Sequence, residues 1–310
     1  MVEVSRYIPS QAAEWNEFVA RSKNGTFLFD RRYMDYHADR FSDHSLIFRR
    51  KGKLVALLPA NVKAHTLYSH QGLTYGGLVM GASVTTNEVA DIFRSMNACL
   101  ASDGIEKVVY RAVPHIYHST PAEEDLYALF HVCGARLTSR QAATVVSTPR
   151  LRFAESRRSG LRKALRSSLT VGRSSDADTF WKILNDNLQQ KYHSKPVHSA
   201  EEMRLLMSRF PNQIKLYLVE KDGEPLGGTI VYETPQVVHT QYISATKEGK
   251  AAGAIDLLFD HLLHREYADV PYFDFGTSLT SDGQLNPRLL FQIEGFGGRA
   301  VCYDTYAWNL

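Results

Sequence analysis

The spacing of apolar residues changes several times along this chain, and each change predicts a switch between strand and helix. The clearest case lies in residues 236–278, where a β-rich run breaks at a Gly/Lys loop. Apolar residues then recur at helical spacing from Ile255 to Leu263, and residues 272–276 form a second strand-like run. This order of strand, loop, helix and strand predicts a βαβ crossover.

The same order of elements occurs twice, once in each half of the chain. From Asp176 onwards the pattern predicts two helices, a hairpin at 214–232, a strand at 237–244, a helix and a strand. The first half gives a similar series, with a hairpin at 45–60 and a helix that starts at a Thr85 to Glu88 capping box. A repeated element order predicts two similar domains with a ligand site in the cleft between them.

We therefore expect an α/β fold with mixed sheets and three parts. An N-terminal domain covers residues 1–148, a basic linker helix covers 149–175, and a C-terminal domain covers 176–310. The last strand, at 301–308, is expected to return to the first domain.

Composition narrows the class of protein. The chain has 310 residues, of which 44% are apolar and 22% charged, so it can bury a large core in about two domains. It has neither a bilayer-spanning apolar run nor the start of a signal peptide, so we expect a cytoplasmic protein without integral membrane association. Cys99, Cys133 and Cys302 are widely spaced, which predicts neither disulfides nor a metal site.

Charge is distributed unevenly, although the net charge of +3 is too small to predict a DNA partner. Residues 150–173 contain eight basic side chains with only Glu155 against them. Arg158 and Arg162 fall on one helical face, which could bind phosphate of a nucleotide-linked substrate or of tRNA. The alternative is a solvated face of an amphipathic helix.

The Gly/Lys loop before the helix at Ile255 suggests a place for an anion. A loop that feeds a helix N-terminus leaves backbone N–H groups and the positive end of the helix dipole facing outward. Gly249, Lys250, Gly253 and Ala254 would then hold the pyrophosphate of a donor. The alternative is an ordinary crossover that binds nothing.

Several segments of the second half resemble one known family. They are RRSGLRKA, KDGEPLGGTIVY, YISATKEGKAAGAIDLLFDHLL, YFDFGTS and the tail GFGGR, joined in the first half by SKNGTFLFDRRYMDYHADRF and VVYRAVPHIYH. Together they are similar to the Fem-type transferases of the GNAT superfamily, which add amino acids to peptidoglycan precursors, and to acetyltransferase-like relatives from envelope polysaccharide clusters. The resemblance implies tandem GNAT-like domains that deliver an acyl group to an amine or hydroxyl.

Acyl transfer needs a deprotonated nucleophile and a protonated leaving group. Asp274 is the first candidate for the base because a strand turns its side chain away from Phe273 and Phe275. It could instead orient the following loop. Tyr242 could protonate the leaving group, or could simply pack in the strand, and Glu294 is a weaker candidate base. Residues expected to bind the acceptor are His70, Tyr75, Arg158, Arg162, Ser278 and Arg299.

These observations lead to one prediction with two alternatives. We predict an N-acyltransferase that moves an acyl group from acyl-CoA to an amine of an amino sugar or related cell-envelope precursor. The first alternative is an aminoacyl transferase that uses aminoacyl-tRNA. The second is a binding module without catalysis, which is favoured by Ile255 at a position that is small in GNAT enzymes and by Ile293 where many Fem-type proteins have lysine.

Overall fold

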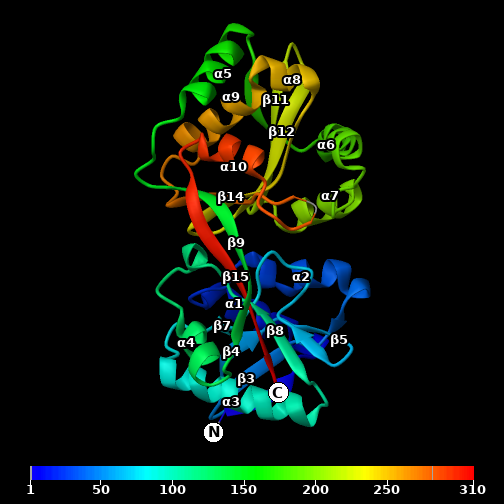
Figure 1. Ribbon diagram of the computed structural model, residues 1–310. Helices are drawn as coiled ribbons and strands as arrows, with labels where there is room; N and C mark the ends of the chain where they lie inside the picture. Colours follow the sequence, from blue (N-terminus) through cyan, green and yellow to red (C-terminus); the bar gives the residue numbers. More distant parts are fainter. Residues whose placement is uncertain (1, 281) are drawn as a thin grey trace. The chain divides into compact units, whose positions relative to one another are not determined.

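The computed structural model describes residues 2–280 and 282–310, and it divides into two compact units (Figure 1). Unit 1 takes the chain up to Gln141 together with Cys302–Leu310, and unit 2 takes Ala142–Val301. The chain passes between the units within two strands, β9 (Arg136–Ser147) and β15 (Arg299–Asn309). The tract at 149–175, which we expected to link two domains, belongs to unit 2.

Unit 1 contains two groups of strands. One is an antiparallel sheet in the order β1-β3-β4-β7, and the other has the order β15-β8-β6-β5-β2 with a parallel β6–β8 pair. The bounds are β1 Val2–Arg6, β2 Ser42–Asp43, β3 Leu46–Arg50, β4 Lys53–Leu58, β5 Asn61–Lys63, β6 Thr66–Tyr68, β7 Val79–Met80 and β8 Lys107–Arg111.

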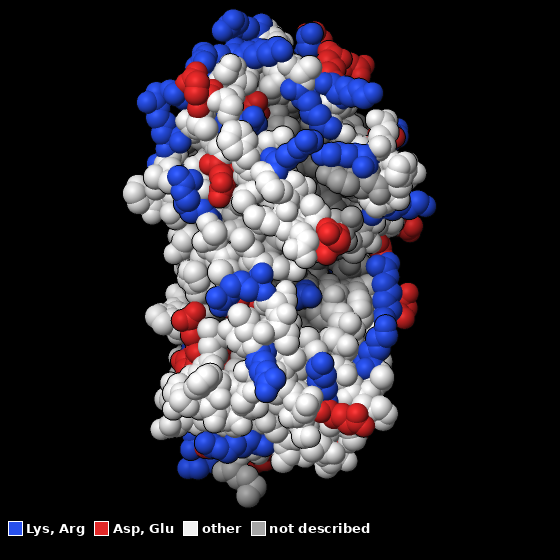
Figure 2. Space-filling view, viewed as in Figure 1, with Lys and Arg blue, Asp and Glu red and all other residues white. Residues whose placement is uncertain are grey.

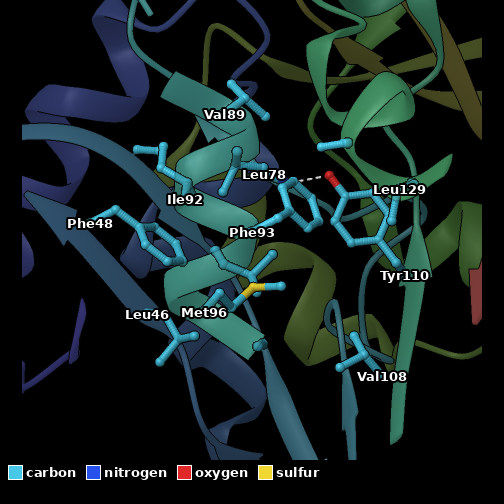
Figure 3. Packing of buried hydrophobic residues seen from close by; sticks show 14 of the residues in the cluster. Leu46, Phe48, Leu78, Val89, Ile92, Phe93, Met96, Val108, Tyr110 and Leu129 are labelled. Carbon is cyan, nitrogen blue, oxygen red and sulfur yellow. Dashed lines mark hydrogen bonds between the residues drawn. The ribbon is translucent and has the colours of Figure 1, made fainter. Parts of the chain in front are cut away.

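One long helix organises the core of unit 1. The helices are α1 Ala12–Arg21, α2 Arg31–Met34, α3 Thr86–Ser102 and α4 Glu124–His131. The predicted capping box starts α3, because the Glu88 carboxylate accepts a hydrogen bond from the Thr85 amide at 2.9 Å. Apolar side chains of α3, among them Phe93 and Met96, pack against side chains of β3 and β8 such as Phe48 (Figure 3). This buried layer fixes the strands of unit 1.

Unit 2 has one sheet, in the order β10-β11-β12-β13-β14-β9. Its strands are β10 Thr170–Ser174, β11 Ile214–Lys221, β12 Glu224–Glu233, β13 Val237–Ala245 and β14 Tyr272–Thr277. Neighbouring strands are antiparallel except for β13 and β14, which run parallel because the connection between them is helical. The predicted βαβ crossover is therefore present.

Helices cover both faces of this sheet (Figure 1). They are α5 Glu155–Arg166, α6 Ala177–Tyr192, α7 Ala200–Arg209, α8 Lys247–Ala252, α9 Ala254–His261 and α10 Pro287–Glu294, with a π-helical turn at Leu262–Glu266. On one face α5 and α9 bury an apolar cluster that includes Phe259, Phe273 and Phe275. On the other face lie α6 and α7, from which Trp181 packs edge-on against Tyr242.

Two elements of unit 2 differ from the prediction. The expected Gly/Lys loop is helical, because the Thr246 hydroxyl caps α8 by accepting a hydrogen bond from the Gly249 amide at 2.9 Å. Gly253 then adopts a left-handed φ of 85°, which ends α8 and starts α9. The sequence pattern also missed α10, although Asn286 followed by proline is a usual start signal.

Candidate active site

The parallel pair β13 and β14 separates partway along its length. Pairing begins at Val237 opposite Tyr272 and ends at His239 opposite Asp274, although both strands continue. A bulge in β13 follows, where Gln241 has no counterpart on β12. Strands that separate in this way leave backbone groups without a neighbouring strand, which makes the fork a candidate ligand site.

Asp274 lies at this fork and is completely buried, with 0% exposure. As predicted, its side chain points away from the apolar cluster that holds Phe273 and Phe275. One carboxylate oxygen lies 2.9 Å from Nδ1 of His239, and the other accepts a hydrogen bond from the Gly276 amide at 2.7 Å. Because a substrate cannot reach the carboxylate, we correct the prediction that Asp274 is itself the base.

His239 is the residue that sequence reasoning missed. Its side chain is 11% exposed, and no described residue hydrogen-bonds to its second ring nitrogen, Nε2. The ring lies against Gly276, whose φ is 73° and where a Cβ atom would stand 3.1 Å from the ring carbon Cε1. The sequence did place the runs VVH and FDF on two strands joined by a helical crossover, which predicts neighbouring parallel strands. It could not show that His239 stands opposite Asp274, because the register across a crossover cannot be read from sequence.

Tyr242 lies on the same face of β13 as His239, because the bulge at Gln241 shifts the alternation of side chains by one residue. Its hydroxyl accepts a hydrogen bond from the His198 amide at 3.2 Å and lies 2.7 Å from Nδ1 of the same residue. Burial raises the pKa of Tyr242 above its ordinary value. Tyr242 therefore keeps its proton at neutral pH, as a proton donor must.

The remaining candidates of unit 2 lie on α10 and the segments beside it. Glu294 ends α10, and none of the described residues forms an ion pair with its carboxylate. Ser278 is buried, and its carbonyl accepts a hydrogen bond from the Asn286 amide at 2.9 Å. Arg299 is exposed and donates to the Gly298 carbonyl at 2.6 Å. Their roles toward a substrate stay predictions.

Of the residues predicted to bind the acyl donor, Gly249 is buried and Lys250 is exposed. Gly249 packs so closely on β12 that a Cβ atom would stand 2.2 Å from the Leu226 carbonyl oxygen. Lys250 is exposed and donates a hydrogen bond to the Asn187 side chain. Burial beside Asn187, and the charge of Lys191, lower the pKa of Lys250. A pocket of about 660 Å³ opens between α6, the start of β12 and the first turn of α8.

The start of α9 is not open as we predicted. A Cβ atom on Gly253 would stand 2.3 Å from the Gly160 carbonyl oxygen, so the backbone of α5 covers this bend. Ala254 is fully buried. Asp256, in the first turn of α9, lies 2.9 Å from the Arg157 guanidinium, and burial raises the pKa of Asp256 to about 6. Because the backbone of α5 covers the bend at Gly253, we correct the prediction of a pyrophosphate site there.

The middle of the basic tract forms α5, in which two arginines share one carboxylate as counterion. Arg158 forms an ion pair with Glu155, and Arg162 lies 2.6 Å from the same carboxylate. Figure 2 shows basic side chains around this end of unit 2 with a few acidic ones among them. The face is exposed and net positive, so both predictions, phosphate binding and a solvated helix, stay open.

The two acceptor residues predicted in unit 1 are buried. The Tyr75 side chain is 2% exposed, and its hydroxyl donates to Thr26 at 3.1 Å. His70 is 5% exposed and has a left-handed φ of 66°. Burial and the neighbouring His37 lower the pKa of His70 to about 4. Because neither side chain offers surface to a ligand, we correct the prediction that they hold the acceptor.

In the part of the chain that the structure describes, His, Cys, Asp and Glu side chains form no group of three that could hold a metal ion. Within residues 2–280 and 282–310, every helix is too short or too polar to cross a bilayer.

The sequence of this chain matches one known family, and its fold is similar to several solved structures. Residues 155–282 match the family model described as "Acetyltransferase (GNAT) domain". No curated protein matches the chain. The match confirms the predicted resemblance to the GNAT superfamily and the predicted class, an acyltransferase.

Solved structures are similar over almost the whole chain. FemX matches with a TM-score of 0.69 and 11% identity, covering 99% of this chain and 97% of its own. The C-terminal domain of a putative lysylphosphatidylglycerol synthetase from Agrobacterium fabrum gives 0.61 at 11% identity, covering 96% and 91%. A tandem GNAT protein from the clavulanic acid biosynthesis pathway gives 0.54 at 12% identity, covering 100% and 98%. These likenesses confirm the predicted fold, a tandem pair of GNAT-like α/β domains.

Proposed function

We propose that this chain, whose residues 155–282 match the acetyltransferase (GNAT) domain model, transfers an acyl group to an amine of an amino sugar or a related cell-envelope precursor. The observation that carries the proposal is the fork between β13 and β14, where pairing stops at His239 and Asp274. An acyl chain laid into such a fork can hydrogen-bond to free strand backbone, and polar side chains stand beside it. Arg299, which is exposed and follows β14 in the chain, is our proposed acceptor contact. Ser278, which is buried, would shape the site from below the surface.

Acyl-CoA is the first donor that we propose. Its support is the GNAT match together with the exposed Lys250 beside the pocket at the first turn of α8. The phosphates of CoA would lie at this pocket, whose lining includes Lys182 and Lys247 together with Asp186, Glu224 and Glu248, and not at the covered bend of Gly253. Gly249 and Ala254 then have a structural role in packing α8 and α9.

Aminoacyl-tRNA is the second candidate donor, and a specific observation favours it. The backbone of α5 covers the start of α9, so the helix N-terminus that we predicted for the pyrophosphate of CoA is closed. The nearby face of α5 is basic and exposed at Arg162. Two of the similar folds, FemX and a protein named as a lysylphosphatidylglycerol synthetase, make aminoacyl transfer a reasonable second proposal.

Ligand binding separates the two donors. Thermal unfolding is measured with CoA, acetyl-CoA and tRNA for the wild type, Lys250→Glu, and Lys53→Glu as a matched control on an exposed lysine of unit 1. Stabilisation by CoA that Lys250→Glu removes, and Lys53→Glu keeps, supports acyl-CoA. Stabilisation by tRNA with a salt dependence that falls in Arg158→Ala and Arg162→Ala supports aminoacyl-tRNA. Binding of neither donor, with no transfer product, contradicts the proposed function.

A further inference from the structure

We propose that His239 is the general base of the transfer, and that Asp274 holds it in the form whose Nε2 atom can take a proton. This inference rests on the proposed function, because a base acts only where an acceptor amine is acylated. The observations that lead to it are the buried pair at the fork, the use of both carboxylate oxygens, and the second ring nitrogen left without a described partner.

The first step of the argument concerns the Asp274 carboxylate. It is fully buried, and one oxygen accepts a hydrogen bond from the Gly276 amide while the other lies 2.9 Å from Nδ1 of His239. A buried carboxylate with a polar partner at each oxygen stays fixed in place. Next to it, the tautomer with a proton on Nδ1 is favoured, because that proton then satisfies the carboxylate. Nε2 is left with its lone pair available.

The second step concerns position. His239 opposite Asp274 is the last residue pair of β13 and β14, so the imidazole lies where the strands part. Gly276, two residues further along β14, leaves no side chain over the ring, and its left-handed φ of 73° disfavours any other residue. A ligand that enters the fork would therefore lie beside Nε2, whereas the Asp274 carboxylate behind the ring stays buried.

The third step is the chemistry. The acceptor nitrogen attacks the carbonyl carbon of the donor, which forms a C–N bond and breaks the bond from that carbon to the sulfur or oxygen of the leaving group. The proton lost by the nitrogen goes to Nε2 of His239. The leaving group takes a proton from the Tyr242 hydroxyl, on the same face of β13, and Tyr242 regains one as His239 releases its own. Protons and electrons balance without a further reactant.

The surroundings of His239 include other ionisable groups. On β14 the neighbour is Asp274, and on β12 Tyr232 stands opposite in the strand register. Tyr242 and His198 follow on the same side of the sheet. Among these groups the Asp274 carboxylate carries the negative charge, and it lies 2.9 Å from Nδ1 of His239.

Unit 2 offers a matched control in a second His–Asp pair. Nδ1 of His264 lies 3.0 Å from Asp260, one helical turn away, and the His264 side chain is 42% exposed. This pair has the same chemistry as His239 with Asp274 but stands on the surface. If any His–Asp pair were sufficient, substitution of His264 would slow the reaction as much as substitution of His239.

Steady-state kinetics of the full chain tests the proposal. We expect His239→Gln to lower kcat by about 10² to 10⁴, with the donor KM nearly unchanged, and Asp274→Asn to lower kcat by about tenfold or more. His264→Gln keeps the wild-type rate. The acidic limb of the kcat/KM profile disappears in His239→Gln, and added imidazole restores part of the rate of His239→Ala. A purely structural role of His239 moves neither readout.

The results that overturn the proposal are distinct from failure of the proposed function. Turnover by His239→Gln within about threefold of the wild type overturns the base, although the transfer itself stands. If the wild type transfers from neither acyl-CoA nor aminoacyl-tRNA, the proposed function fails, and nitrogen NMR of the imidazole then tests the pair. A proton on Nδ1 that shifts in Asp274→Asn supports the arrangement, whereas the Nε2–H form overturns it.

Discussion

Each unit buries histidine, but in different surroundings. In unit 1, His70 lies with its ring 5.7 Å from that of His37 and accepts a hydrogen bond from the Gly72 amide, while no described carboxylate bonds to it. In unit 2, His239 has the Asp274 carboxylate at 2.9 Å. The pKa of His70 is lowered to about 4, chiefly by burial. A carboxylate partner therefore separates a histidine suited to proton transfer from one that only packs.

The sharpest way to break this comparison is to remove the carboxylate. Asp274→Ala leaves the Gly276 amide and Nδ1 of His239 unpaired in the interior, which we expect to cost about 3 to 5 kcal/mol of unfolding free energy. Urea denaturation measures the change. Asp260→Ala, at the surface pair, should cost less than about 0.5 kcal/mol. Equal effects at both sites would contradict the structural role that we give Asp274.

The next prediction concerns the covered start of α9. Gly253→Ala adds a methyl group 2.3 Å from the Gly160 carbonyl oxygen at a left-handed φ, and should destabilise by about 3 kcal/mol. Gly223→Ala is the matched control, since its φ is 83° and nothing lies within 4 Å of the new methyl. It should cost about 1 kcal/mol. Similar losses, measured by urea denaturation, would show that α5 does not close this bend.

The histidine of unit 1 predicts acid sensitivity. A His70 pKa near 4 in the folded chain lies below its ordinary value of 6.5, so stability is lost as pH falls from 6.5 towards 4. In the wild type the free energy of unfolding should fall between pH 7 and pH 4.5. In His70→Asn this fall should be smaller by about 2 kcal/mol, and asparagine tolerates the left-handed φ. Some acid sensitivity should remain in His70→Asn, because the pKa of His118 is also lowered to about 4. An unchanged pH dependence would contradict the burial effect.

The smallest expected effect concerns Asp256. Its pKa near 6 is raised above the ordinary value of 3.8, so this carboxyl makes the fold less stable as pH rises from about 4 to 6. The difference in unfolding free energy between the wild type and Asp256→Asn should therefore change by about 1 kcal/mol between pH 5 and pH 8, after allowance for solvent screening. A difference that stays constant with pH would mean that Asp256 is well solvated.

Part of this arrangement could be predicted from sequence. The alternation of Phe273, Asp274 and Phe275 predicted a side chain turned away from the core, and the repeated element order predicted tandem domains. The partner of Asp274 could not be predicted, because the register across a helical crossover depends on packing. The closed bend was missed for a similar reason, since it depends on Gly160 of α5 meeting Gly253.

The most direct test of the account is the amount of amide product formed with acetyl-CoA or aminoacyl-tRNA as donor and an amino sugar nucleotide as acceptor. Mass spectrometry compares the wild type with His239→Gln and with His264→Gln. The account predicts product from the wild type and from His264→Gln, and at least about a hundredfold less from His239→Gln. No product from the wild type with either donor, or equal product from His239→Gln, would contradict it.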